Sequence, residues 1–213
     1  MKAVIEKSEN ISAAPGEVIR GYPASAADRL LAIADELRPV QLPMPESLTT
    51  TVAEVAACKR PETLYEGGWP KKCPAIYRIG AATAVAGELW RLAQSEHERR
   101  KAVAVEHKNI GAGAKVKHEY QMARLNGYEG KACLYVGKAN DLTPRLRQHF
   151  GKHSPTTFAM HLSMWAPVSL WKKTLTIEYW PLQDLGLSTA AIQALEDFIW
   201  EDSAPVFGKQ GAK

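Results

Sequence analysis

The sequence predicts an α+β fold in which helices flank a small central sheet. Three short segments have the character of strands, residues 73–80, 131–139 and 174–180. Apolar and polar side chains alternate along the second and third, and the first is an apolar run bounded by Pro74 and Gly80. In the second strand, one face is expected to carry Ala132, Leu134 and Val136, and the other Cys133 and Tyr135. Longer segments around the strands carry apolar residues at helical spacing, so we expect helices and strands to share one core.

The N-terminal region, residues 1–72, is predicted to be an arm followed by helices. Glycine and proline punctuate residues 1–23, which favours an irregular or partly extended conformation. Ser25 can cap a helix with apolar residues at helical spacing, and Pro39 ends it. A stiff proline-rich connector follows, and we expect a short second helix at residues 52–58.

The segment between the first two strands, residues 81–130, is predicted to be an inserted helix and a basic loop. Residues 81–108 are rich in Ala, Glu, Arg and Leu, which favour helices. The glycine-containing stretch 111–120 then has the character of a loop. The helix and loop could enter a groove of a nucleic acid, or the helix could pack on the sheet and show its charges to solvent. The sequence favours neither interpretation.

The second and third strands are each followed by a helix with a capping residue. Asp141 can cap the first of these helices. Its apolar stripe is Leu142, Leu146 and Phe150. Arg145 and His149 are four residues apart and therefore neighbours on another face. Ser188 can cap the second helix, which is expected to run to about Asp202. This helix is expected to bury Ile192, Leu195, Phe198 and Ile199.

The composition is that of a soluble globular protein. Of 213 residues, 46% are hydrophobic and 23% are charged, which excludes a fibre, a disordered tail and a membrane bundle. The three cysteines lack the paired spacing of a disulfide framework or a zinc site. The first ten residues lack the apolar run of a signal peptide, and no window approaches the roughly 20 apolar residues of a spanning helix. We therefore expect a cytoplasmic protein without a membrane partner.

The net charge of +4 is unevenly distributed along the chain. Residues 91–153 carry thirteen Lys and Arg against six Asp and Glu, so this segment holds all of the basic excess. A clustered positive field of this kind attracts a phosphate backbone. A solvated, charge-rich helix without a partner would give the same count.

Two of the strands carry motifs that together resemble the signatures of the GIY-YIG nuclease family. Residues 75–77, Ala-Ile-Tyr, match the first signature with Ala for Gly, and residues 135–137, Tyr-Val-Gly, match the second with Val for Ile. The two signature strands of that family are usually joined by a short hairpin turn. Here Tyr77 and Tyr135 are 58 positions apart, so an insertion must separate the strands.

Three further positions extend the resemblance. Arg145 follows the second signature tyrosine by ten residues, and His149 follows four residues later, as in the family. The family's metal-binding glutamate lies in a helix nine residues before a proline, which fits Glu196 and Pro205. Gly208 stands where many members carry an asparagine. The ordered set of matches is specific, although no single tripeptide is.

The resemblance implies a small central, mainly antiparallel sheet and a catalytic domain at residues 73–213. It also implies a metal-dependent DNA endonuclease with a single divalent ion, Mg²⁺ or Mn²⁺. The implied catalytic residues are Tyr77, Tyr135, Lys138, Arg145, His149 and Glu196. Phosphodiester hydrolysis needs a positioned water, neutralisation of the phosphoryl charge and stabilisation of the departing oxygen. In this scheme Tyr77 is the general base or orients the water, Arg145 binds the phosphate, and Glu196 holds the metal. A nearby cation must lower the pKa of Tyr77, and Lys138 and the metal are the candidates.

DNA is the expected partner, and basic residues outside the motifs are expected to contact it. These are Arg99, Arg100, Lys101, Lys108, Lys115, Lys117 and Arg147. The small size of the chain and its embedded recognition elements favour a type II restriction endonuclease. Such an enzyme is expected to act as a homodimer and to have a cognate DNA methyltransferase as its partner. The alternatives are a structure-directed repair, recombination or mobile-element nuclease, and a DNA-binding module without catalysis.

Overall fold

The protein forms two compact units, Met1–Val40 and Gln41–Lys213. A computed structural model describes residues 15–109, 120–151 and 156–211, and within the first range the side chains of residues 25–103 only. None of the helices in these ranges is both long and apolar enough to cross a membrane.

The described part of the first unit contains helix α1 (Pro15–Leu37). The sequence predicted that this helix would start at Ser25, but it begins ten residues earlier, at Pro15. The expectation of an irregular arm is therefore wrong for residues 15–23. Proline suits the first position of a helix, because its φ angle is already helical and no N–H bond is lost there.

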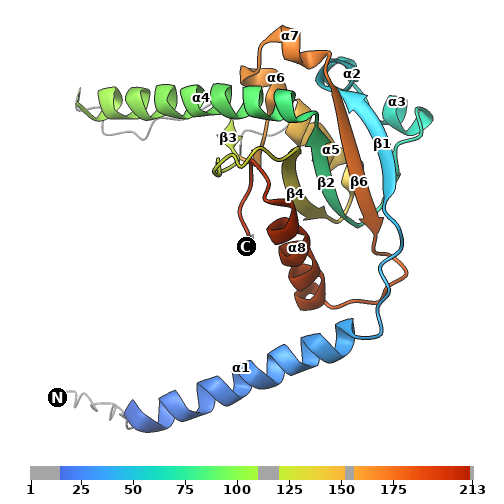
Figure 1. The fold of residues 1–213 in the computed structure, drawn as a ribbon, viewed down its shortest axis with the longest axis vertical. Coiled ribbons are helices and arrows are strands. Elements are labelled where there is room, and N and C mark those ends of the chain that lie inside the picture. The colour runs from blue at the N-terminus through green and yellow to red at the C-terminus, as the bar shows by residue number, and fades with distance from the viewer. Residues whose placement is uncertain (1–14, 110–119, 152–155, 212–213) are drawn as a thin grey trace, which may run out of the picture. The chain divides into compact units, whose positions relative to one another are not determined.

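The second unit is built on a four-stranded antiparallel sheet with the order β1-β6-β2-β4 (Figure 1). Its strands are β1 (Glu46–Thr51), β2 (Ala75–Ala81), β4 (Cys133–Ala139) and β6 (Thr174–Pro181). Its helices are α2 (Val52–Ala57), α3 (Pro61–Glu66), α4 (Thr83–Asn109), α5 (Leu142–Phe150), α6 (Leu162–Trp165), α7 (Val168–Trp171) and α8 (Thr189–Ser203). A short parallel pair, β3 (Gln121–Met122) and β5 (Phe158–Ala159), lies apart from the sheet. The predicted α+β class, with helices flanking a small sheet, is confirmed.

All three predicted strands are present, and β2 and β4 are neighbours despite the long insertion between them. Strand β1 was not predicted, because its sequence ESLTTT shows no apolar alternation. Its place comes from backbone pairing with β6 along its whole length. Residues 41–72, which the sequence assigned to an N-terminal region, therefore belong to the same unit as the sheet.

A β-bulge in the β2–β4 pair changes which side chains of β4 share a face. Leu134 and Tyr135 both join the core cluster that contains Tyr77. Cys133 and Val136 join the smaller cluster that packs against α8. The predicted grouping of Leu134 with Val136, and of Cys133 with Tyr135, is therefore wrong, because the bulge shifts the alternation by one residue.

Helices cover both faces of the sheet (Figure 1). Helix α8 packs on β4, and α5 lies on the other face among the apolar side chains of the larger core. The predicted burial of Phe198 on α8 is wrong, since this side chain is 69% exposed. The inward face of α8 consists of Ala191, Glu196, Ile199 and Ser203. The inward face thus includes the carboxylate of Glu196, whereas Phe198 points to solvent.

Candidate active site

Two tyrosines from adjacent strands form the centre of the site. Tyr77 on β2 is fully buried, and Tyr135 on β4 is nearly so. Their rings are stacked, with centroids 6.0 Å apart and planes inclined by 16°. Gly137 lies directly opposite Tyr77 in the strand pairing, and both rings pack over it. The strand pairing thus brings together two residues that are far apart in the sequence.

Helix α5 carries Arg145 and His149 to the two hydroxyl groups. Its predicted apolar stripe is confirmed: Leu142, Leu146 and Phe150 are fully buried. Asp141 occupies the N-cap position, but its side chain makes no capping hydrogen bond. The Nε of Arg145 donates to the hydroxyl of Tyr77 at 3.2 Å, and Nη2 donates to the hydroxyl of Tyr135 at 3.1 Å. One guanidinium therefore binds both tyrosines.

His149 is the second donor to Tyr77, and its neighbours define its tautomer. The backbone N–H of Met160 donates to Nδ1 of His149 at 3.3 Å, so Nδ1 carries no proton. A neutral ring must then carry its proton on Nε2, which lies 2.9 Å from the Tyr77 hydroxyl. Burial, with the nearby charges of Arg145 and His161, lowers the pKa of His149 well below 6.5. His149 is therefore a neutral hydrogen-bond donor at physiological pH.

The Tyr77 hydroxyl oxygen accepts both of these hydrogen bonds, so its own proton is directed elsewhere. Burial and the adjacent Tyr135 raise the pKa of Tyr77 above its ordinary value, and Arg145 opposes the rise. The sequence prediction named Lys138 as a cation that would lower this pKa. Among the described residues, the cation bonded to Tyr77 is Arg145, and Lys138 points instead to helix α8.

Glu196 on α8 is the metal-binding residue that the sequence predicts. Its side chain is 6% exposed, and Lys138 Nζ lies 3.4 Å from its Oε2. That contact is not aligned as a hydrogen bond, and Oε2 has no hydrogen-bond partner in the described part of the chain. Burial raises the pKa of Glu196, and Lys138 opposes the rise. The charge of Glu196 also raises the pKa of Tyr77, which places the carboxylate within electrostatic reach of the two tyrosines.

The donor set around Glu196 fits a hard divalent ion that keeps most of its water. Its buried Oε2 receives no hydrogen bond from the part of the chain that the structure describes, and the side-chain amide oxygen of Gln193 lies one turn earlier on the same helix. Such oxygens suit Mg²⁺ or Mn²⁺. Within the described ranges, no group of three His, Cys, Asp or Glu side chains offers a fully protein-ligated site.

The predicted DNA-binding residues on α4 are engaged in local ion pairs. Arg99 and Arg100 both bind Glu96, with Nε–Oε distances of 2.7 and 2.8 Å, and Lys101 binds Glu98 at 2.7 Å. Arg100 also donates to the backbone carbonyl of Tyr120 and lies 3.9 Å from the centre of that ring. Helix α4 projects beyond the sheet (Figure 1), so the exposed Arg99 and Lys101 remain at the surface.

The remaining predicted DNA contacts divide into two groups. Arg147 donates to the backbone carbonyls of Cys58 and Lys59, at 3.3 and 3.2 Å, and so ties α5 to the end of α2. The side chain of Lys108 and the whole of Lys115 and Lys117 lie outside the described residues.

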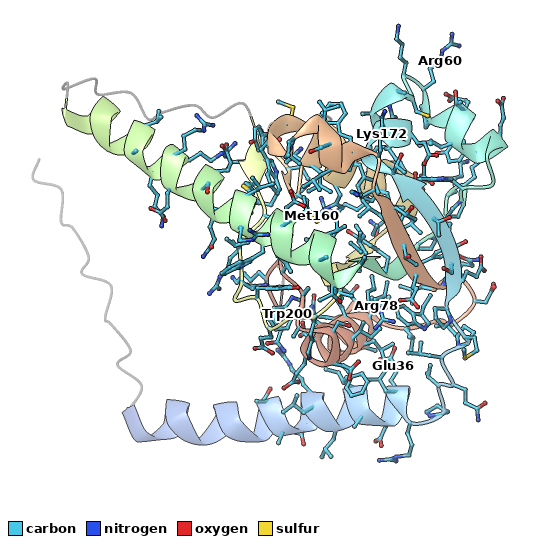
Figure 2. The ribbon with its side chains drawn as sticks, turned by 45° about the horizontal axis from the view of Figure 1, so that its top comes forward. Glu36, Arg60, Arg78, Met160, Lys172 and Trp200 are labelled. Carbon is cyan, nitrogen blue, oxygen red and sulfur yellow. The ribbon has the colours of Figure 1, made fainter. Side chains whose placement is uncertain are left out.

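Several residues of the site carry no sequence signal of their own. Gln193 is the clearest case, although its spacing of three from Glu196 places both on one face of a helix. Gly208, at φ +112°, packs against the Tyr135 ring, so an asparagine at that position would be strained. The indole N–H of Trp200 on α8 (Figure 2) has no hydrogen-bond partner among the described residues and borders Gly208.

The tyrosine pair and Arg145 thus form one hydrogen-bond network, and the buried carboxylate of Glu196 is linked to that network through its charge. Comparisons of the chain with family models, with curated proteins and with solved structures find no match.

Proposed function

We propose that the protein is a metal-dependent DNA endonuclease of the GIY-YIG type, which hydrolyses phosphodiester bonds. The observation that supports this most strongly is the convergence of Tyr77, Tyr135, Arg145 and His149 in one hydrogen-bond network. A buried carboxylate, Glu196, lies within electrostatic reach of that network. Taken singly, each of these five residues would ordinarily be a packing or surface residue. Their placement together favours a reaction site.

Arg145 supplies fixed positive charge for the scissile phosphate. The neighbouring hydroxyls of Tyr77 and Tyr135 raise its pKa although burial opposes this, so the guanidinium stays charged. Its hydrogen bonds to both tyrosines hold it in one orientation before substrate binds. A preorganised charge of this kind stabilises the negative charge that grows on phosphoryl oxygens in the transition state.

In this proposal Tyr77 orients the attacking water and takes its proton. The water oxygen forms a bond to phosphorus, and the bond to the departing 3′ oxygen breaks with its electron pair. Because burial raises the pKa of Tyr77, its hydroxyl is protonated before substrate binds, and it can take the water proton only by passing its own proton to an oxygen of the substrate in the same step. The N–H groups of His149 and Arg145 both donate to the Tyr77 oxygen and therefore stabilise its anionic form.

Glu196 would hold the divalent ion, with the remaining positions filled by water and substrate oxygens. Such an ion, when bound, neutralises charge on the phosphate and on the departing oxygen. The buried Oε2 of Glu196 has no hydrogen bond from the described residues that would compete for it. Tyr135 binds Arg145 and completes the network around the phosphate.

Within this class we favour a type II restriction endonuclease that acts as a homodimer, with a cognate DNA methyltransferase as its biological partner. A homodimer would place one site on each strand of duplex DNA. The exposed basic residues of the projecting helix α4 support an embedded recognition element. A structure-directed nuclease and a DNA-binding module without catalysis are the alternatives.

Plasmid DNA incubated with the protein and Mg²⁺ or Mn²⁺ tests the proposal. Discrete fragments would indicate a site-specific enzyme, and nicked circles or a smear would indicate a structure-directed one. No cleavage in any divalent metal would contradict the endonuclease assignment.

The variant Glu196→Gln identifies the site responsible. It should abolish metal-dependent cleavage and leave DNA binding measurable by gel shift. Glu201→Gln, an exposed position on the same helix, is the matched control and should cleave as the wild type does. Retained cleavage in Glu196→Gln would contradict the assignment of the metal site.

A further inference from the structure

We infer that Gln193 and Glu196 together form the divalent-cation site, and that the ammonium of Lys138 occupies this site when no metal is bound. The inference rests on the metal dependence in the proposed function and adds Gln193, a residue that no motif suggested. It also assigns Lys138 to the cation site, whereas the sequence led us to expect that Lys138 lowers the pKa of Tyr77.

The positions of two oxygens define the site. Lys138 Nζ donates a short hydrogen bond to Oε1 of Gln193 and lies 3.4 Å from Oε2 of Glu196. Gln193 and Glu196 are three residues apart on α8, so both side chains project from one face of the helix. A single positive charge thus contacts one amide oxygen and one carboxylate oxygen.

The orientation of the Gln193 amide is determined by its other end. Its Nε2 donates to Oδ1 of Asp197 at 2.9 Å. The same Asp197 oxygen accepts the backbone N–H of Gly211 at 2.8 Å, which holds the carboxylate in place. Oε1 must then face Lys138, so Gln193 presents an oxygen and not an N–H to the cation.

A divalent ion suits these oxygens better than the ammonium does. The contact of Lys138 with Glu196 is not aligned as a hydrogen bond, so the buried Oε2 remains without one among the described residues. Leaving a buried charged acceptor unpaired is costly. Glu196 and Asp197 also carry two negative charges against the single charge of Lys138, which attracts a doubly charged ion. Amide and carboxylate oxygens are ligands that Mg²⁺ and Mn²⁺ accept.

The competing interpretation is that Lys138 is a permanent structural counterion of Glu196. The two interpretations predict opposite effects of removing the ammonium. If Lys138 and the metal compete for the same oxygens, Lys138→Met must strengthen metal binding. If the ion pair only holds α8 on β4, Lys138→Met lowers stability and leaves metal affinity unchanged or weaker.

Titration of Mn²⁺ into the full chain without DNA, followed by electron paramagnetic resonance, measures this affinity directly. Lys138→Met should tighten Mn²⁺ binding by about tenfold, and Gln193→Ala should weaken it by about tenfold. Gln193→Leu keeps a side chain of similar size but has no oxygen, so it should weaken Mn²⁺ binding as much as Gln193→Ala. Glu196→Gln should show no binding.

Lys173→Met, at an exposed position on the loop before β6, is the matched control and should bind Mn²⁺ as the wild type does. Thermal unfolding of each variant identifies any that fails to fold, and Gln193→Leu then replaces Gln193→Ala. The inference is overturned if Lys138→Met and the Gln193 variant both bind Mn²⁺ with the affinity of the wild type. It is also overturned if Lys138→Met binds Mn²⁺ more weakly than the wild type. Metal binding as expected without DNA cleavage by the wild type would overturn the endonuclease proposal and leave the cation site standing.

Discussion

Gly137 lies directly opposite Tyr77 in the antiparallel pairing of β2 and β4, and the rings of Tyr77 and Tyr135 occupy the space that a side chain there would need. A Cβ at position 137 would be 2.6 Å from Cε1 of Tyr135 and 3.0 Å from the hydroxyl oxygen of Tyr77. Both rings are buried and bonded to Arg145, so neither can move without breaking the network. The glycine is therefore a requirement of the ring positions.

Gly137→Ala is expected to lower the free energy of unfolding by about 1–3 kcal/mol, because the added methyl group overpacks the rings. Cleavage should fall by more than this loss of stability would explain, since both hydroxyls are displaced from Arg145. Urea denaturation and cleavage rates measure the two effects. Gly127→Ala is the control, because a Cβ at 127 would meet no atom within 4 Å and the variant should behave as the wild type.

The sequence predicted the strands that carry the tyrosines, because their apolar residues are bounded by turn residues. It also predicted α5 and α8 from the helical spacing of their apolar residues, although only Ser188 caps its helix and Asp141 makes no capping hydrogen bond. Strand β1 could not be predicted, since it is polar and its place comes from pairing with β6. The motif spacing predicted that Tyr77, Tyr135, Arg145 and His149 act together, but the sharing of one guanidinium by two hydroxyls depends on tertiary packing. The proposed role of Gln193 likewise depends on how α8 is rotated against β4.

Tyr77→Phe and Tyr135→Phe should differ in both stability and activity. Tyr77→Phe leaves the N–H groups of His149 and Arg145 without their shared acceptor, and this should cost about 1–3 kcal/mol of unfolding free energy. Tyr135→Phe removes a single bond to Arg145 and should cost less. Single-turnover cleavage should fall by at least about a hundredfold in Tyr77→Phe. Wild-type cleavage by Tyr77→Phe would rule out its role in proton transfer.

The stability of the protein should depend on pH through His149. Its pKa in the folded protein lies well below 6.5, so the unfolded chain binds a proton first as the pH falls. The contribution of His149 is therefore complete above about pH 6.5 and is lost as the pH falls from 6.5 toward the folded pKa. The expected slope is about 1.4 kcal/mol per pH unit in that window.

Urea denaturation between pH 7.5 and 5 measures this slope. His149→Gln keeps an N–H donor toward Tyr77 but cannot be protonated, so the variant should lose most of the slope. The pKa of His97 is also lowered by burial, and His97→Gln serves as a separate comparison in the same range. Glu96, with its pKa lowered to about 2 by hydrogen bonds from Arg99 and Arg100, affects stability only at more acidic pH. An unchanged slope in His149→Gln would contradict the assignment of His149 as a neutral donor.

Substitution of the two arginines of α4 that share Glu96 should distinguish a structural role from a role in DNA binding. Arg100 is 11% exposed and bonds both Glu96 and the backbone of Tyr120, so Arg100→Ala should lower the free energy of unfolding by about 1–3 kcal/mol. Arg99 is exposed, and Arg99→Ala should leave stability essentially unchanged. If α4 contacts a phosphate backbone, Arg99→Ala combined with Lys101→Ala should reduce the salt dependence of DNA affinity, measured by fluorescence anisotropy over a range of salt concentrations. An unchanged salt slope would mean that the Glu96 and Glu98 pairs already satisfy these charges and that α4 is a structural helix.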